Sequence, residues 1–151
     1  MDPFKLLKED HKDFKAMLSE MEESTDRATK KRQQMFEEFK KKVTAHEAIE
    51  EEILYPALEA RAKDKDLVLE AYQEHHLADL QVEELTDIDV SDETWAPRVK
   101  VLRESLEHHI EEEEGALFKA VRAAFDADEI EEFGDQMQER KLELLGETAT
   151  P

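Results

Sequence analysis

The stretches HEAIEEEILYP, residues 46–56, and HHIEEEEGALF, residues 108–118, contain one pattern twice. In each, a histidine is followed four positions later by a glutamate: His46 and Glu50, then His109 and Glu113. Residues four apart lie on the same face of a helix. Apolar residues precede both pairs at helical spacing: Phe36, Phe39 and Val43 in one case, Val99, Leu102 and Leu106 in the other. The face is therefore expected to be buried.

Histidine and glutamate on a buried face need a partner, because an isolated charge is costly to remove from water. A bound cation supplies the missing charge and is the commonest reason for this combination. The chain contains no cysteine, so any metal must be held by nitrogen and oxygen atoms.

The composition indicates one all-α domain. A length of 151 residues suits a single core, and 41% of the residues are charged while Gly and Pro are scarce. Asp2 before Pro3 predicts the start of a helix over about 3–23. A second helix is expected to end or kink near Pro56, and a third over about 68–86. A fourth follows a loop at 87–94, with Ser91 or Thr94 as its cap, and extends to about residue 125.

A shorter helix over about 129–145 closes the chain. The expected fold is an up-down-up-down antiparallel four-helix bundle with a short extra C-terminal helix. The domain is expected to cover residues 1–145, and residues 146–151 to form a frayed tail.

The positions of the histidines test whether the helices are arranged as antiparallel hairpins. Facing residues in an antiparallel hairpin are equidistant from its turn, so their midpoint must fall in a connection. His11 with His46 gives about 28.5, His46 with His75 about 60.5, and His75 with His109 about 92, which are the three predicted connections. All four histidines therefore share one layer.

That layer predicts a metal site with six ligands: His11, His46, Glu50, His75, His109 and Glu113. Four imidazoles and two carboxylates suit two transition-metal ions bridged by the glutamates better than structural zinc, calcium or magnesium. Two irons are the preferred interpretation. Six ligands do not fill two octahedra, so positions remain for oxygen, peroxide, nitric oxide or a solvent-derived bridge.

Several neighbouring residues leave alternatives open. His75 is favoured over His76 because it aligns with Ala71 and Ala78, and His108 is expected to face solvent. Glu47 is interpreted as a surface residue, although it could add a ligand beside His46. Tyr55 and Tyr72 are expected to pack with their hydroxyl groups in water, although they could donate hydrogen bonds near the site. In the acidic run 111–114, only Glu113 has the helical spacing that places it on the same face as His109.

At these residues the chain resembles the hemerythrin-like, or HHE cation-binding, family over residues 1 to about 145. The matching words are EDH at 9–11, HEAIEEEILYP at 46–56, EHH at 74–76 and HHIEEEEGALF at 108–118. The resemblance implies a four-helix bundle with a non-haem di-iron centre, two Fe ions with an oxo or hydroxo bridge. It is closest to the H, HxxxE, H, HxxxE variant of actinobacterial hemerythrin-like proteins. Oxygen-carrying hemerythrins have a second histidine where this chain has Asp79, which disfavours simple oxygen carriage.

The resemblance implies reaction with peroxide, oxygen or nitric oxide, catalase-like or protective against oxidative stress. The alternative is an oxygen- or iron-binding or sensing module without turnover, and a metal-free bundle would require the histidine layer to be a coincidence. A net charge of -20 excludes nucleic acid and anionic membranes as favoured partners. The absence of an apolar signal segment predicts a cytoplasmic protein. The sequence does not indicate the oligomeric state.

Overall fold

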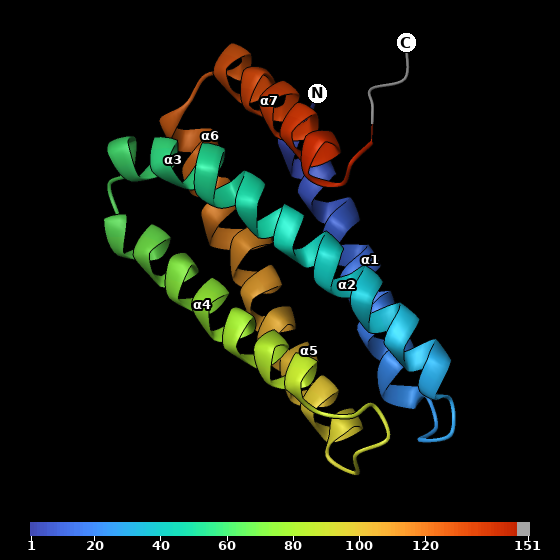
Figure 1. Cartoon of the computed structure of the whole chain (residues 1–151). Coiled ribbons are helices and arrows are strands. Elements are labelled where there is room, and N and C mark those ends of the chain that lie inside the picture. Colours follow the sequence, from blue (N-terminus) through green and yellow to red (C-terminus); the bar gives the residue numbers. More distant parts are fainter. Residues whose placement is uncertain (148–151) are drawn as a thin grey trace.

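The computed structural model describes residues 1–147, and all regular structure within them is helical. In order, the elements are α1 (Pro3–Glu23), α2 (Thr29–Ile49), η1 (Glu50–Leu54), α3 (Tyr55–Arg61), α4 (Lys65–Asp87), α5 (Trp95–Glu112), η2 (Glu113–Leu117), α6 (Phe118–Ala124) and α7 (Ala127–Leu144). Four long rods form the antiparallel bundle: α1, then α2 through α3, then α4, then α5 through α6 (Figure 1). The predicted four-helix bundle with an extra C-terminal helix is confirmed.

The second and fourth rods each contain a π-helical turn, η1 and η2, that begins at a glutamate of the repeated pattern. The second rod does not end near Pro56, because it continues beyond the proline to Arg61, and its regular α-helix is interrupted by η1 just before Pro56. The fourth rod was predicted as one helix to about residue 125, and it contains the equivalent turn. A π-turn inserts one residue into a helix and is frequent at functional sites.

The helix ends follow local capping chemistry. The Asp2 carboxylate accepts hydrogen bonds from the backbone of Phe4 and Lys5, which confirms the predicted start of α1. Asp126 and Glu129 form a reciprocal capping box at the start of α7. Thr94 occupies the position before α5, but its side chain donates to Asp92 and does not cap the helix.

The core is divided into two apolar clusters, one on each side of the histidine layer. Along α1, Phe4 and Leu7 belong to one cluster and Phe14 and Leu18 to the other, so His11 lies between them. The same division holds on the other three rods. The histidines therefore lie in the middle of the hydrophobic core.

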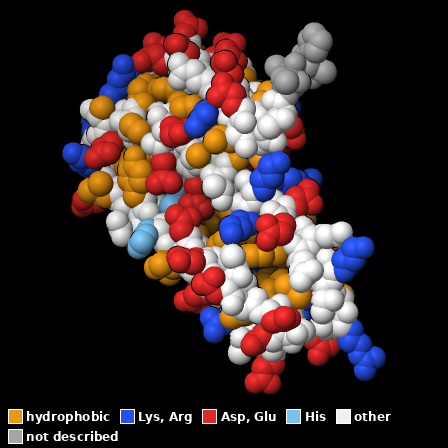
Figure 2. Space-filling model, in the orientation of Figure 1, with side chains coloured by type: hydrophobic (Ala, Val, Ile, Leu, Met, Phe, Trp, Pro, Cys, Tyr) orange, Lys and Arg blue, Asp and Glu red, His pale blue; other side chains and the backbone are white. Residues whose placement is uncertain are grey.

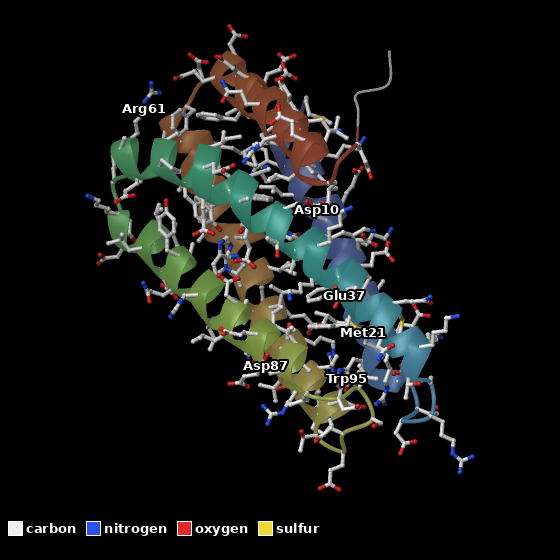
Figure 3. All side chains as sticks on the ribbon, viewed as in Figure 1. Asp10, Met21, Glu37, Arg61, Asp87 and Trp95 are labelled. Atoms are coloured by element: carbon white, nitrogen blue, oxygen red, sulfur yellow. The ribbon has the colours of Figure 1, made fainter. Side chains whose placement is uncertain are left out.

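A buried arginine closes the loop end of the bundle. The Arg32 guanidinium donates to the Ser24 hydroxyl and carbonyl oxygens and to the carbonyl of Val90, and stacks over Trp95 at 4.5 Å. Figure 3 shows Trp95 at this end, near Met21. One side chain thus ties together the loops at 24–28 and 88–94.

The C-terminal helix α7 packs across α1 and α2 at the opposite end (Figure 1). A Cβ atom added at Gly134 would lie 1.8 Å from the carbonyl oxygen of Met1, so only glycine permits this approach. α7 ends at Leu144, and Gly146 has a φ of +71°. Residues 148–151 of the predicted frayed tail lie outside the described residues.

The surface is strongly acidic, with Asp and Glu side chains spread over the face shown in Figure 2 and fewer Lys and Arg among them. Within residues 1–147, no helix combines the length and the apolarity needed to cross a membrane.

Candidate metal centre

The six predicted ligands meet in one buried layer. The four histidines come one from each rod, and none is more than 4% exposed. Their Nε2 atoms all point inward, toward the two glutamates that begin η1 and η2. The carboxylates of Glu50 and Glu113 are themselves buried.

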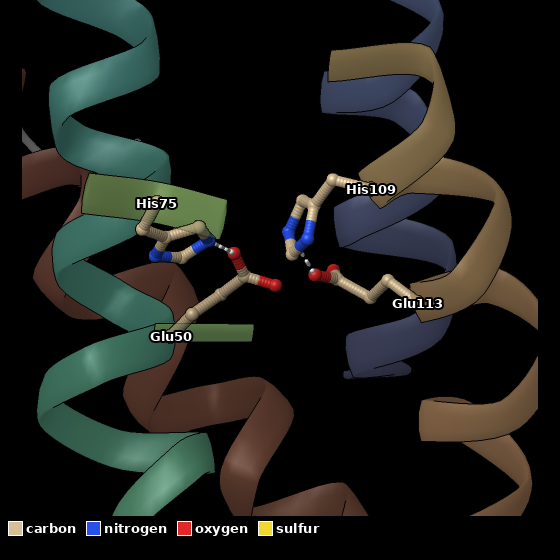
Figure 4. A group of neighbouring side chains, drawn as sticks. All are labelled: Glu50, His75, His109 and Glu113. Carbon is tan, nitrogen blue, oxygen red and sulfur yellow. Dashed lines mark ion pairs between the residues drawn. The ribbon is translucent and has the colours of Figure 1, made fainter. Parts of the chain in front are cut away.

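Each glutamate lies between two histidines from different hairpins. One oxygen of Glu50 is 3.1 Å from His46 Nε2 and 3.2 Å from His75 Nε2. The two oxygens of Glu113 are 3.3 Å from His11 Nε2 and 3.0 Å from His109 Nε2. Figure 4 shows Glu50, His75, His109 and Glu113 converging from opposite sides. The arrangement has an approximate two-fold repeat, as the sequence repeat requires.

These donor atoms fit a bound metal because many of them have no other partner. Both oxygens of Glu50, one oxygen of Glu113, and Nε2 of His11 and of His109 are buried without a hydrogen bond. Leaving such groups unsatisfied costs about 1–3 kcal/mol each, and more for charged groups. Ligand atoms within 4.8 Å of one another form two sets that share Glu113: Glu50, His75, His109 and Glu113, then His11, His46 and Glu113. Two cations would satisfy both sets.

A second ring of carboxylates holds the outer nitrogens of the histidines. His46 Nδ1 is 2.8 Å from Asp10, His109 Nδ1 is 2.8 Å from Glu74, and His11 Nδ1 is 2.7 Å from Glu114. His75 Nδ1 lies 3.4 Å from Glu51 but forms no hydrogen bond with it. An ionised carboxylate can only accept, so Nδ1 of His11, His46 and His109 carries the hydrogen and Nε2 is the nitrogen free to bind metal.

Sequence reasoning missed this second ring, although a signal was present. Each of the four carboxylates is the chain neighbour of a predicted ligand: Asp10 of His11, Glu51 of Glu50, Glu74 of His75, and Glu114 of Glu113. Within 111–114 only Glu113 was predicted to be in register, yet the carboxylate of Glu114 also reaches the site and contacts His11.

Comparison with known proteins identifies the family. Residues 2–121 match the family described as "Hemerythrin HHE cation binding domain". The chain belongs to this family. A crystal structure of a hemerythrin HHE cation-binding domain-containing protein, the Rv2633c homolog from Mycobacterium kansasii, superimposes with a TM-score of 0.85. The two are 26% identical, and the match covers 97% of this chain and 88% of the other.

A longer relative contains a similar segment. This HHE domain is 28% identical over 148 residues to a protein from Nostoc sp. named "DNA nickase". The match covers 96% of this chain, which spans 41% of the length of that curated relative.

The charges in the HHE domain's layer shift its pKa values strongly. Burial lowers the pKa of His46, but the carboxylates of Glu50 and Asp10 outweigh it and raise the pKa to about 10. Burial also lowers the pKa of His75, but Glu50 and Glu51 outweigh this effect and raise the pKa to about 10. At His109, Glu113 and Glu74 outweigh burial in the same way, and the pKa is again raised to about 10. Without metal, protons therefore provide the positive charge of the layer.

Tyr55 was expected to keep its hydroxyl in water, and this was wrong. The side chain is fully buried, and its hydroxyl donates a hydrogen bond of 2.9 Å to Glu113 and lies 3.3 Å from His75 Nε2. Burial and the nearby carboxylates raise the pKa of Tyr55 well above its usual value, so it stays neutral. Tyr72 is half-buried and packs edge-on against Tyr55.

The structure also decides which of the residues next to the predicted ligands lie in the layer. His75 is 3% exposed and lies in the layer, whereas His76 and His108 are exposed. Glu47 was interpreted as a surface residue, which was wrong, because it is buried between His75 and Asp79. Burial and the carboxylates of Asp79 and Glu51 raise the pKa of Glu47 to about 9, against the effect of His75.

A small cavity of about 10 Å³ lies against the layer on the side of the apolar cluster that contains Phe14 and Leu18. Its wall is mainly apolar, with two carboxylic side chains, and includes Phe14, Val43, Ala78, Leu106, Ile110, Glu47 and Glu74 beside the four histidines. This volume has room for about one water-sized molecule.

Proposed function

We propose that this HHE domain binds two iron ions in the six-residue layer and reacts there with peroxide, oxygen or nitric oxide, with a catalase-like or stress-protective role. The observation that carries the proposal is the convergence of four inward Nε2 atoms on two buried carboxylates, of whose four oxygens three have no hydrogen bond. The family's cation-binding character agrees with it.

The donor set favours iron among the possible ions. Calcium and magnesium prefer oxygen ligands, and structural zinc prefers four ligands with tetrahedral geometry. Imidazole and carboxylate together suit iron. His11 and His46 would hold one ion and His75 and His109 the other, with Glu50 and Glu113 shared. Iron bound there would supply Lewis acidity and a change of oxidation state to a small oxygen- or nitrogen-containing molecule.

The residues around the layer would control access and protons. The apolar cavity wall excludes bulk water and admits only a molecule of a few atoms. Glu47 places a carboxyl group on that wall, where it can hold a proton for the bound molecule. Tyr55 fixes one oxygen of Glu113 by its hydrogen bond, and so holds that carboxylate in position.

Binding without turnover, for oxygen or iron, is the second candidate. The small volume of the cavity and its mainly apolar wall favour it, because they can retain a small molecule without supplying many catalytic groups. Two observations oppose extending the activity in the Nostoc protein's name to this chain. A net charge of -20 opposes binding to DNA, and the match spans only 41% of that protein.

The test is oxygen release after hydrogen peroxide is added to the iron-loaded protein, measured with an oxygen electrode. Oxygen evolution in the wild-type protein that is lost in His75→Ala and retained in His76→Ala supports turnover at this layer. Glu47→Gln is expected to keep the iron and lower the rate. Iron-loaded protein that releases no oxygen would favour the binding function.

A further inference from the structure

The fourth rod, where α5 continues into η2, contains the histidine–glutamate spacing in two adjacent registers. His109 and Glu113 point into the layer, and His108 and Glu112, one residue earlier, lie on the outer side of the same helix. The outer side chains are accessible, with 63% of His108 and 37% of Glu112 exposed. The corresponding positions before the first pattern are Ala45 and Ile49, so only the second half of the repeat carries an outer pair.

Glu74 of α4 connects the inner and outer registers. One of its oxygens lies 2.8 Å from His109 Nδ1, and the other faces His108 Nε2 at 3.6 Å. His108 Nε2 is also 3.3 Å from Glu112. Ligand atoms of Glu74, His108 and Glu112 all lie within 4.8 Å of one another.

These outer separations suit a shared cation better than direct hydrogen bonds. Hydrogen bonds between such groups are about 2.7–3.2 Å long. Two ligands at zinc-like distances of about 2.0–2.1 Å on a tetrahedral ion are themselves separated by about 3.3 Å. The contacts of 3.3 and 3.6 Å are close to that separation, so a small ion would need little rearrangement.

In the first half of the repeat, the carboxylate equivalent to Glu74 has a cationic partner that Glu74 lacks within the described part of the chain. Asp10 is the counterpart of Glu74, because each precedes a ligand histidine and holds the Nδ1 of another. The second oxygen of Asp10 is neutralised by the ammonium group of Lys141. Among residues 1–147, no Lys or Arg forms an ion pair with Glu74. A positive charge therefore occupies this place in one half and is missing in the other.

We propose that Glu74, His108 and Glu112 form an outer site for one divalent transition-metal cation, which replaces the ammonium group found in the first half. One imidazole and two carboxylates are suitable ligands for zinc and its neighbours, and solvent would complete the coordination. The imidazole disfavours calcium and magnesium, which prefer oxygen ligands. The site lies outside the iron layer and adjoins it through Glu74, whose other oxygen contacts His109 Nδ1.

The test uses the full chain after saturation with iron, titrated with Zn²⁺ and followed by equilibrium dialysis. The wild-type protein should bind one more zinc per chain than His108→Ala or Glu112→Gln. His76→Ala removes another exposed histidine from α4 and should bind as the wild type does. Equal zinc binding by the wild type and His108→Ala would overturn the proposal, as would loss of the ion in His76→Ala.

Failure of the outer site can be told apart from failure of the inner one. The difference in bound zinc between the wild type and His108→Ala counts only the outer ion. The iron content of the same samples shows whether the inner layer is occupied. His108 is exposed, so its replacement should leave the helical circular dichroism unchanged.

Discussion

The hydroxyl group of Tyr55 makes a contact whose energy can be predicted. Tyr55→Phe keeps the buried ring and removes only the hydroxyl group, which donates to Glu113 at 2.9 Å and lies 3.3 Å from His75 Nε2. Hydrogen bonds to charged groups contribute about 1.5–3 kcal/mol, and the change leaves a buried carboxylate oxygen without that partner. The free energy of unfolding of the metal-free protein should fall by about 1.5–3 kcal/mol, with Tm lowered by roughly 3–12 °C.

The assay is urea unfolding followed by circular dichroism in the presence of a chelator. Tyr72→Phe is the control, because Tyr72 is half-buried and packs against Tyr55, but its hydroxyl makes no hydrogen bond within residues 1–147. The control should change stability by less than about 0.5 kcal/mol. If both variants lose the same stability, or neither does, the reasoning about the Tyr55 contact is refuted.

Three further changes test other parts of the account. Three layer histidines have pKa values raised to about 10 in the folded protein against 6.5 as the reference value, so the metal-free fold binds more protons than the unfolded chain. Its stability should be greatest below about pH 6.5 and fall as the pH rises to 10; urea midpoints independent of pH over this range would contradict this. Gly134→Ala should cost about 1–3 kcal/mol by thermal unfolding because its Cβ would collide with the Met1 carbonyl, whereas Gly115→Ala, with open space around it, should be tolerated. Arg32→Met removes three hydrogen bonds of a buried cation and should cost at least about 3 kcal/mol in urea unfolding, against no more than about 0.5 kcal/mol for exposed Arg27→Met. Similar losses in the two arginine variants would show that the loop contacts contribute little.

The histidine layer could be predicted because two simple constraints act together. The four-residue spacing places His46 with Glu50, and His109 with Glu113, on one helix face. The antiparallel hairpins then bring residues equidistant from each turn to the same level. The predicted turn positions agree with the connections at 24–28, 62–64 and 88–94 within the error of helix boundaries.

The π-turns could not be predicted by the same reasoning, because the pattern up to each glutamate has ordinary helical spacing. A weak signal follows it. Leu54 and Tyr55 are adjacent in sequence and both buried, as are Leu117 and Phe118. Adjacent residues on a regular helix are about 100° apart, so a buried pair in both copies is compatible with an inserted residue.

The second ring of carboxylates and the burial of Glu47 depend on contacts between helices. In an acidic chain, a glutamate beside a ligand cannot be distinguished from a solvated one by spacing on its own helix. The rotation of each rod about its axis decides which of Glu47 and Glu51 approaches His75, and periodicity fixes that rotation only coarsely.

The most direct test of the central claim is the iron content of the purified, iron-reconstituted chain, measured by elemental analysis with protein quantified in the same sample. Two irons per chain are predicted for the wild type and for His76→Ala, and no more than one for His75→Ala. A wild-type chain that binds no iron, or a His75→Ala variant that still binds two, would contradict a di-iron centre built on this layer.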